Sequence, residues 1–314
     1  MAKVLGIDTS NYTTSAAMLD TESIKVYQSK KLLPVREGEK GIRQSEAVFH
    51  HTKQLPEVIK SLMSVERAIP DSIGVSVKPR LEEGSYMPCF LAGEGFADSL
   101  GSVLGIIPDK TSHQIGHILA AIYSSGRFDL IREKKAFAAF HISGGTTDLL
   151  LCEPDESCIL DIKRIGGSSD LKAGQAIDRC GVMLGLSFPC GRGIEALALG
   201  SSASFKIRPS VKGLDCSLSG LENKCKEMMK NENTKEDIAK FCIMYILEAL
   251  KAITKGFYDS YGDKTVIYAG GVMSNKLIRD ELESRERVFC EPEFSRDNAC
   301  GAAVYSALKR GLIV

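Results

Sequence analysis

The sequence predicts an α/β fold built from two lobes, and three observations support this prediction. Apolar segments of strand length alternate with segments of helical length along the whole chain. The 314 residues, 44% of them hydrophobic, are enough for two lobes or one large domain. Residues 5–19 (LGIDTSNYTTSAAML) and 140–151 (FHISGGTTDLLL) share one layout, in which a turn rich in Ser, Thr and Gly joins two apolar strands.

The expected elements follow from apolar patterning and from turn and capping residues. We expect strands at 3–8, 13–20 (antiparallel to the first), 72–77 and 287–291. Helices are expected at 93–105, at 173–185, from about 236 to 258 and at 297–311. Residues 134–152 read as strand, glycine turn and strand, and residues 264–282 as strand, Gly-Gly turn and helix. A further helix begins near residue 111, with Asp109, Thr111 or Ser112 as its N-cap.

The two similar hairpins lie roughly half a chain apart, as a duplicated lobe requires. Their turns would then face a shared cleft from opposite lobes, which resembles the layout of actin-like ATPases and sugar kinases. The alternative is two unrelated hairpins, because Ser/Thr/Gly turns are common.

Composition excludes several classes of protein. Lys plus Arg and Asp plus Glu both total 40, so no global field favours a polyanion, and an RNA contact would need a local basic patch. The longest strongly apolar run, 241–247, is far short of a membrane span, and the N-terminus has no secretory pattern. Ten scattered cysteines without a C-x-x-C pair favour reduced thiols in a cytoplasmic enzyme.

Two turns have the chemistry of a phosphate site. In SGGTTD, Gly144 and Gly145 allow close approach of backbone N–H groups, and Ser143 and Thr146 add hydroxyl donors. In IDTSNYT, Asp8 is a candidate for holding a cation directly or through water, and local turn bonding is the alternative.

A third turn, YAGGVMSN, offers room for a flat purine. Gly270 and Gly271 leave bare backbone after a strand, and Asn275 is placed to cap the following helix or to bond a ligand. An ordinary strand-to-helix turn is the alternative. There is no G-x-x-x-x-G-K-[ST] motif, and no G-x-G-x-x-G follows a strand, which excludes a P-loop and argues against a Rossmann cofactor.

The histidines raise the question of a metal. His113 and His117 are four residues apart, so a helix would place both rings on one face. Such a pair needs at least one further ligand, and spacing alone favours two polar residues that share a face. His50 and His51 are adjacent and are interpreted as surface or core polar residues.

Seven motifs in order resemble the TsaD family, also called Gcp or YgjD, from residue 4 to about 308: GIDTS, SHQIGH, ISGGTTD, AGQAIDRCGVMLGLSFPCG, CSLSGL, YAGGVMSN and SRDNACGAA. The resemblance implies an actin-like ATPase (ASKHA) fold, with two duplicated RNase-H-like lobes around a central nucleotide and metal cleft. The lobes would be 1–125, completed by the C-terminal helix 297–314, and 126–296. The implied activity is transfer of threonylcarbamoyl from threonylcarbamoyl-adenylate to adenosine 37 of transfer RNA.

The resemblance also implies site residues. It assigns a divalent metal, iron or zinc, to His113, His117 and Asp297, and His141 stands where some members have a metal-binding tyrosine. An adenine nucleotide or adenylate, with Mg, is implied near Asp178 and Glu195, whose carboxylates would accept ribose hydroxyl bonds. The full set on the nucleotide and substrate side is Ser10, Asn11, Ser143, Gly144, Gly145, Thr146, Gly174, Asp178, Gly191, Glu195, Gly270, Gly271 and Asn275.

The first loop departs from the family pattern. The family reads Thr-Ser-Cys-Asp-Glu-Thr, whereas this chain has Tyr12 and Thr13 in place of the acids. Lys78-Pro79-Arg80 replaces Gly-Pro-Gly, and Gln175 replaces a glutamate. Thr146 stands where His or Asn is usual. The candidates for the reacting group are therefore Thr13, Lys78 and Arg80, and the pattern is typical of a diverged paralogue.

The leading hypothesis is a metal-dependent transferase that uses threonylcarbamoyl-adenylate or a similar carbamoyl-adenylate. The alternatives are a non-catalytic nucleotide-binding paralogue and a small-molecule carbamoyltransferase. The expected partners are transfer RNA and a TsaB-like paralogue or other threonylcarbamoylation proteins, with no membrane, and the chain as monomer or dimer. Phosphoryl transfer is disfavoured by the histidine pair, and a peptidase has no H-E-x-x-H motif to support it.

Overall fold

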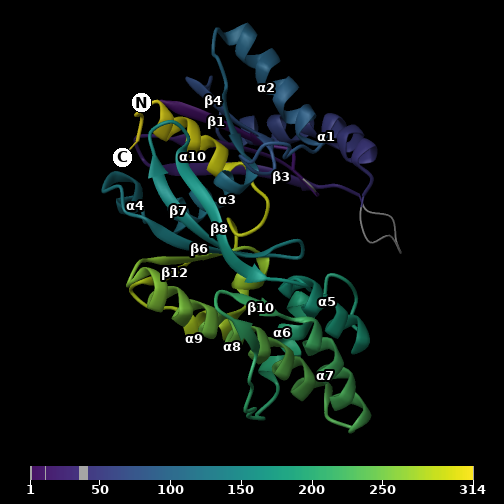
Figure 1. The fold of residues 1–314 in the computed structure, drawn as a ribbon. Coiled ribbons are helices and arrows are strands. Elements are labelled where there is room, and N and C mark those ends of the chain that lie inside the picture. Colours follow the sequence, from purple (N-terminus) through teal and green to yellow (C-terminus); the bar gives the residue numbers. More distant parts are fainter. Residues whose placement is uncertain (1, 11, 35–41, 314) are drawn as a thin grey trace. The chain divides into compact units, whose positions relative to one another are not determined.

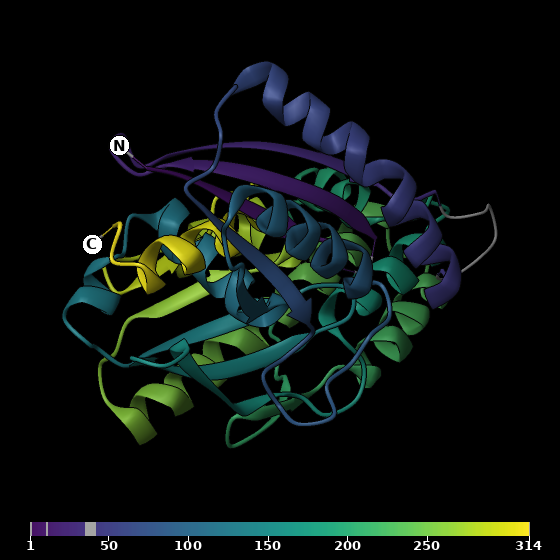
Figure 2. The same ribbon diagram turned by 90° about the horizontal axis from the view of Figure 1, so that it is seen from above.

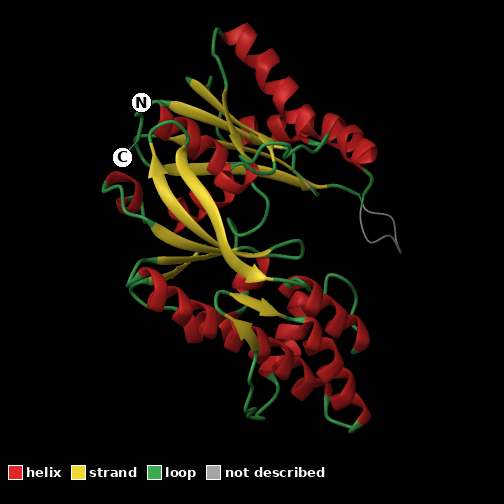
Figure 3. Cartoon of the chain, in the orientation of Figure 1, coloured by secondary structure: helices red, strands yellow, loops and turns green. Residues whose placement is uncertain are grey.

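The computed structural model describes residues 2–10, 12–34 and 42–313 (Figure 1). The chain divides into two units, each with strands and helices of its own (Figure 3). The first unit contains residues 1–135, 154–161 and 296–314, and the second contains 136–153 and 162–295. The lobe boundaries expected from the sequence stay a prediction of the domain organisation.

The first unit contains a five-stranded sheet in the order β3-β2-β1-β4-β5. Neighbours β1, β2 and β3 pair antiparallel, whereas β1, β4 and β5 run parallel to one another. Parallel order brings the ends of β1, β4 and β5 to the same edge, where helix α3 begins. The strands are β1 (Lys3–Asp8), β2 (Thr13–Asp20), β3 (Lys25–Leu32), β4 (Ser72–Lys78) and β5 (Asp109–Ser112).

Helices cover both faces of this sheet. Leu5 and Ile7 belong to the core beneath α1 (Gln44–Val65) and α2 (Phe90–Leu104). Figure 2 shows α1 as the long helix that runs along the purple strands. Because side chains alternate along a strand, Gly6 and Asp8 face the other side, which α3 (His113–Ser125) and α10 (Cys300–Lys309) cover. The short helix α4 (Asp129–Arg132) follows α3.

Three glycines allow α10 to pack closely against the sheet and α3. A Cβ on Gly6 or Gly74 would overlap the backbone of α10 or of the residue before it, at the carbonyl oxygens of Ala299 and Ala302 respectively. A Cβ on Gly301 would overlap the carbonyl oxygen of Gly116 in α3. Sheet, α3 and α10 therefore pack backbone against backbone, and this packing brings the segment before α10 to the start of α3.

The second unit contains a seven-stranded sheet in the order β12-β11-β6-β7-β8-β10-β9. Strand β6 pairs antiparallel with β7 and parallel with β11, which pairs parallel with β12. The tips of β7 and β8 belong to the first unit. The strands are β6 (Phe137–Ile142), β7 (Thr147–Asp155), β8 (Ile159–Ser168), β9 (Ser210–Lys212), β10 (Asp215–Ser217), β11 (Val266–Ala269) and β12 (Arg287–Phe289).

The core of the second unit lies between this sheet and its helices. The rings of Phe140, Tyr268 and Phe289 form a stack, with successive centroids 5.1 and 4.7 Å apart. Thr254 of the long helix α8 lies 2.8 Å from the Tyr268 hydroxyl, so this buried phenol has its polar partner. The helices are α5 (Ala173–Met183), α6 (Gly191–Leu199), α7 (Ser219–Lys230), α8 (Lys235–Tyr261), the 3₁₀ helix η1 (Gly271–Ser274) and α9 (Lys276–Leu282).

Most expected elements are present, but three expectations need correction. Asp109 and Thr111 lie in β5, so Ser112 alone caps α3, with its hydroxyl accepting a bond from Ile115 N at 3.3 Å. The last helix begins at Cys300, so Asp297 precedes it and is not its first residue. The elements β3, β5, β8, β9, β10, α1, α4, α6 and α7 were not expected.

Two expectations from composition can be compared with the structure. All ten cysteines are present as thiols and not as disulfides. Among the described residues, the helices are too short or too polar to cross a membrane.

Candidate functional site

Three residues that are distant in sequence form a cluster suited to a metal. His113 and His117 start α3 with their ring centroids 4.3 Å apart, which confirms that the pair shares one helix face. Asp297 Oδ1 lies 3.3 Å from His117 Nε2 and 3.6 Å from His113 Nε2. One ligand atom from each residue lies within 4.8 Å of the others. Two imidazoles and a carboxylate are a donor set that suits zinc or iron, so these residues fit a divalent metal.

Charges around the cluster determine the protonation of the two rings. Burial alone would lower the pKa of His113, but the carboxylates of Asp8 and Asp297 outweigh it and raise that pKa to about 10. Burial and the charge on His113 lower the pKa of His117. The pKa of Asp297 is low despite its burial, because both histidines bond to it. Without metal, one ring therefore carries a proton that an ion bound at its Nε2 would replace.

The fourth predicted metal ligand, His141, lies in the second unit. It is buried on β6, in register with Asp148 of β7 and Ala269 of β11. Its role as a ligand stays a prediction.

The first loop holds two predicted residues that are described and one, Asn11, that lies outside the described residues. Ser10 is buried, and its hydroxyl and its backbone N–H both donate to Asp8 Oδ1. Thr13 is buried at the start of β2, and its N–H donates to Ser10 O at 3.2 Å. A backbone hydrogen bond therefore joins Ser10 and Thr13.

The loop after β4 lies directly against the start of α3. Lys78 pairs with Ser112 at a bulge between β4 and β5, and the carbonyl of Pro79 accepts a bond from Gln114 N at 3.0 Å. The ammonium of Lys78 donates to the Leu81 carbonyl, at 3.4 Å. Among the described residues, Lys78 therefore has no carboxylate partner. The backbone N–H of Arg80 donates to Ser85 Oγ at 3.0 Å.

The predicted phosphate turn of the second unit lies at the start of α5. Ser143 Oγ accepts bonds from the N–H groups of Gly145 and Thr146, each at 3.2 Å, and lies 2.8 Å from Thr146 Oγ1. Gly174 N donates to Ser143 O at 3.2 Å, and a Cβ on Gly174 would lie 2.7 Å from Gly144 N. The turn and the first N–H groups of α5 are thus in contact, while Gly144 and Gly145 face open space.

The Gly-Gly turn lies beside the phosphate turn, because β6 and β11 are parallel neighbours. Gly270 has a φ of 98°, and a Cβ there would overlap the carbonyl oxygen of Ile142. Gly271 has nothing within 4 Å of its Cβ position. Asn275 caps α9 by accepting a bond from Ile278 N at 3.3 Å. The ordinary helix cap is therefore present, and it leaves the bare backbone of Gly271 facing space.

The two predicted ribose carboxylates each hold the start of a helix. Asp178 Oδ1 accepts a bond from Cys190 N, just before Gly191 at the start of α6, at 2.8 Å. Burial raises the pKa of Asp178, against the effect of that bond. Glu195 Oε1 accepts from Lys276 N, the first residue of α9, at 2.6 Å. Sequence reasoning missed these capping bonds, because each joins residues of different elements.

We expect substitution by alanine to destabilise the protein at one glycine of the Gly-Gly turn and not at the other. Gly270→Ala should cost about 2 kcal/mol of unfolding free energy, because its φ is positive and its Cβ meets backbone. Gly271→Ala should change that free energy by less than about 0.5 kcal/mol, because its Cβ position is open. Urea unfolding measures both, and equal losses would contradict the expected contrast. If a purine lies on Gly271, the second variant should instead bind adenine nucleotides more weakly.

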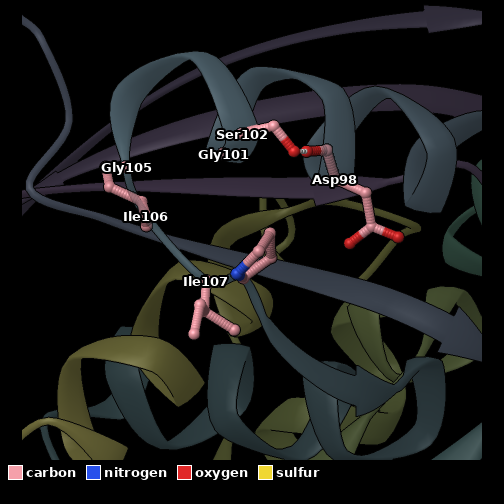
Figure 4. Close-up of a pocket in the computed structure, with 7 residues that line it drawn as sticks. Asp98, Gly101, Ser102, Gly105, Ile106 and Ile107 are labelled. Atoms are coloured by element: carbon pink, nitrogen blue, oxygen red, sulfur yellow. Dashed lines mark hydrogen bonds between the residues drawn. The ribbon is translucent and has the colours of Figure 1, made fainter.

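A surface pocket at the C-terminal end of α2 contains none of the predicted site residues (Figure 4). Its polar groups are mostly engaged: Ser102 Oγ donates to Asp98 O at 2.8 Å, and the Asp98 carboxylate pairs with Lys110 at 2.9 Å. The lining is Asp98, Gly101, Ser102, Gly105, Ile106, Ile107 and Pro108. This pocket therefore offers little chemistry for catalysis.

Solved structures identify the class of fold. The chain is similar to HypF in its phosphate- and nucleotide-bound form, with a TM-score of 0.62 and 12% identity over 98% of this chain and 55% of that one. It is also similar to component A of (R)-2-hydroxyglutaryl-CoA dehydratase from Acidaminococcus fermentans, with a TM-score of 0.56 and 14% identity over 99% of both chains. A ROK family glucokinase from Streptomyces griseus matches with a TM-score of 0.52 and 9% identity, over 98% of this chain and 99% of that one. The chain has the actin-like ATPase fold, as expected from the sequence.

Sequence comparison then identifies the family. The profile of TsaD, tRNA N6-adenosine threonylcarbamoyltransferase, matches residues 25–304. An enzyme of that name from Thermosipho africanus is 28% identical over 98% of this chain and 95% of its own length. One from Aromatoleum aromaticum is 27% identical over 98% of this chain and 91% of its own length. The chain belongs to the TsaD family.

Proposed function

We propose that the chain is a metal-dependent transferase that takes the threonylcarbamoyl group from threonylcarbamoyl-adenylate, or from a similar carbamoyl-adenylate, with transfer RNA adenosine 37 as acceptor. The cluster of His113, His117 and Asp297 carries the proposal, because it keeps a complete donor set in a chain whose first loop has diverged. A protein that served only as a structural partner would have no need to keep two histidines and a carboxylate in contact.

The proposed ligands of the metal are His113, His117 and Asp297, with His141 as a candidate fourth. A divalent iron or zinc ion would act as a Lewis acid toward the carbonyl of the threonylcarbamoyl group. The fold itself positions these residues: α3 carries both imidazoles within its first five residues, and the packing of α10 places the carboxylate that precedes it.

The proposed adenylate site is the edge of the second unit where β6 and β11 end. Gly144 and Gly145 are candidates for binding the phosphate, because neither glycine places a side chain over the turn, although the Gly145 N–H donates to Ser143 Oγ in this structure. Gly271 offers bare backbone to the purine. Asp178 and Glu195 lie on α5 and α6 with one carboxylate oxygen each engaged in capping, so each has a second oxygen as a candidate acceptor for ribose hydroxyls. Mg is a candidate companion of the phosphate.

Two cations of the first unit, Lys78 and Arg80, are candidates for a role in the reaction. Among the described residues, the ammonium of Lys78 has only a carbonyl partner. Lys78 ends β4 directly before Pro79, whose carbonyl is bonded to the first turn of α3. We propose that Lys78 and Arg80 stabilise negative charge on the leaving adenylate phosphate. The same charges favour an anionic small molecule as acceptor, which is the second candidate function.

Transfer of label tests the proposal. The purified chain, loaded with iron or zinc, is mixed with threonylcarbamoyl-adenylate labelled in threonine and with unmodified transfer RNA, with and without a TsaB-like paralogue and other threonylcarbamoylation proteins. We expect label in the RNA as threonylcarbamoyladenosine, detected by nucleoside mass spectrometry. Loss of transfer in Lys78→Ala would support the role of that cation.

Three other outcomes would redirect the proposal. Label that appears on an added small anionic acceptor, but never on RNA, would favour the small-molecule carbamoyltransferase. Binding of adenylate without turnover in any mixture would favour the non-catalytic paralogue. A chain that binds neither metal nor adenylate would contradict both the enzyme and the nucleotide-binding alternative.

A further inference from the structure

Asp8 is a buried carboxylate without a place in the metal cluster. It ends β1 on the side of the sheet that α3 and α10 cover, and its side chain is 1% exposed. Burial of a charged carboxylate is costly unless hydrogen bonds and an opposite charge compensate it. The contacts that compensate the burial of Asp8 therefore indicate its role.

The two carboxylate oxygens of Asp8 have different partners. Oδ1 accepts from the backbone N–H and the hydroxyl of Ser10, which fixes the plane of the carboxylate. Oδ2 lies 2.9 Å from Nδ1 of His113. The opposite ring nitrogen of His113, Nε2, is the one that faces Asp297. The carboxylate, the imidazole and the proposed metal position thus follow one another in a line of contacts.

We infer that Asp8 is a positioning residue: it holds the proton of His113 on Nδ1 and aims the Nε2 lone pair at the metal. Histidine ligands generally donate their second N–H to such a partner, which fixes the tautomer and the ring orientation. Ser10 acts one contact further out, because its two bonds leave Oδ2 as the oxygen that faces the ring. This inference rests on the metal site of the proposed function.

The substitution Asp8→Asn tests this inference because it replaces a charged carboxylate by a neutral amide of nearly the same volume. The amide also has an NH₂ group that donates hydrogen bonds, which the carboxylate lacks. The two donors of Ser10 would keep the amide oxygen on their side, so the NH₂ group would face His113. That group needs an acceptor, so Nδ1 would lose its proton and Nε2 would gain it, which removes the lone pair that binds metal. Asp8→Asn should therefore weaken metal binding at least as much as Asp8→Ala.

Metal affinity, measured by chelator competition with zinc, is the primary measurement. We expect both variants to bind zinc about 10- to 100-fold more weakly than the parent chain. The visible absorption bands of the cobalt-substituted protein should also shift. Asp20→Asn is the control, because it removes a carboxylate at the opposite end of β1 and β2 that pairs with Lys3. It should bind zinc as the parent chain does.

Combining Asp8→Asn with His113→Ala distinguishes a positioning role of Asp8 from an effect on general stability. If Asp8 acts through His113, Asp8→Asn should cause no further loss of affinity in His113→Ala, whereas it should still do so in a chain that retains His113. Circular dichroism shows whether each variant is folded. If Asp8→Ala is unfolded, the test of the inference rests on the isosteric variant Asp8→Asn. Zinc binding by Asp8→Asn within twofold of the parent chain would overturn the inference and leave the metal site intact. A parent chain that binds no zinc would instead overturn the proposed function.

Discussion

Asp297→Ala is expected to leave the protein folded and to abolish stable binding of a divalent metal. Asp297 is the anionic member of the cluster and lies 3.3 Å from His117 Nε2. Loss of a partner behind a ligand already costs about 10- to 100-fold in affinity, so loss of the ligand itself should cost more. Elemental analysis after gel filtration should find close to one ion per parent chain and almost none in the variant.

The control for this variant is Asp98→Asn. Asp98 is a half-exposed carboxylate of the same unit that pairs with Lys110 at 2.9 Å, and its loss should leave the metal content unchanged. Threonylcarbamoyl transfer should fall together with metal content in Asp297→Ala. Full metal occupancy in that variant would contradict the assignment of the ligand.

Gly301→Ala is expected to destabilise the first unit by about 3 kcal/mol, near the upper end for an overpacked core. The added methyl group would overlap the carbonyl oxygen of Gly116, and neither backbone can yield without moving α10 from α3. Because His113 and His117 belong to α3 while Asp297 precedes α10, the variant should also lose metal. Urea unfolding and elemental analysis measure the two effects.

Gly95→Ala is the matched control, since Gly95 also lies inside a helix of the first unit. Nothing lies within 4 Å of its Cβ position, so the higher helix propensity of alanine should stabilise the variant by about 0.5–1 kcal/mol. Opposite signs for two Gly→Ala changes in helices of one unit would identify close backbone packing as the cause. If Gly301→Ala is also stabilised, α3 and α10 do not pack as described.

The part of the site that lies within one element could be predicted from sequence. The four-residue spacing of His113 and His117 predicts a shared helix face, and α3 provides it. No spacing connects these residues with Asp297, and only the family resemblance suggested it. The contact of Asp297 with the two histidines depends on Gly301, whose role becomes visible only when two distant helices are in place. Asp8 was a candidate for holding a cation, whereas the structure places it against His113.

Physical reasons explain why β3 and α1 of the first unit were not predicted from the sequence. Strand β3 has no fully buried residue, so it lacks the apolar alternation on which strand prediction depends. Helix α1 uses polar residues in its buried stripe: His51 and Gln54 bond the hydroxyl of Thr14 at 2.8 and 3.0 Å. Pro56 inside the helix further obscures its periodicity. Tertiary hydrogen bonds thus occupy part of the buried stripe of α1, where the pattern requires apolar residues.

The place of α10 in the first unit has a consequence for how the protein is made. The ribosome delivers His113 and His117 early, but the sheet face that holds them lacks its cover until residues 296–314 emerge. At about 5–20 residues per second, that delay is on the order of tens of seconds. During this time Gly6 and Gly74 have no helix above them, and the histidines have no carboxylate from Asp297. Metal capture would therefore be limited to chains whose synthesis has passed α10, and a chain truncated before that point would not hold the ion.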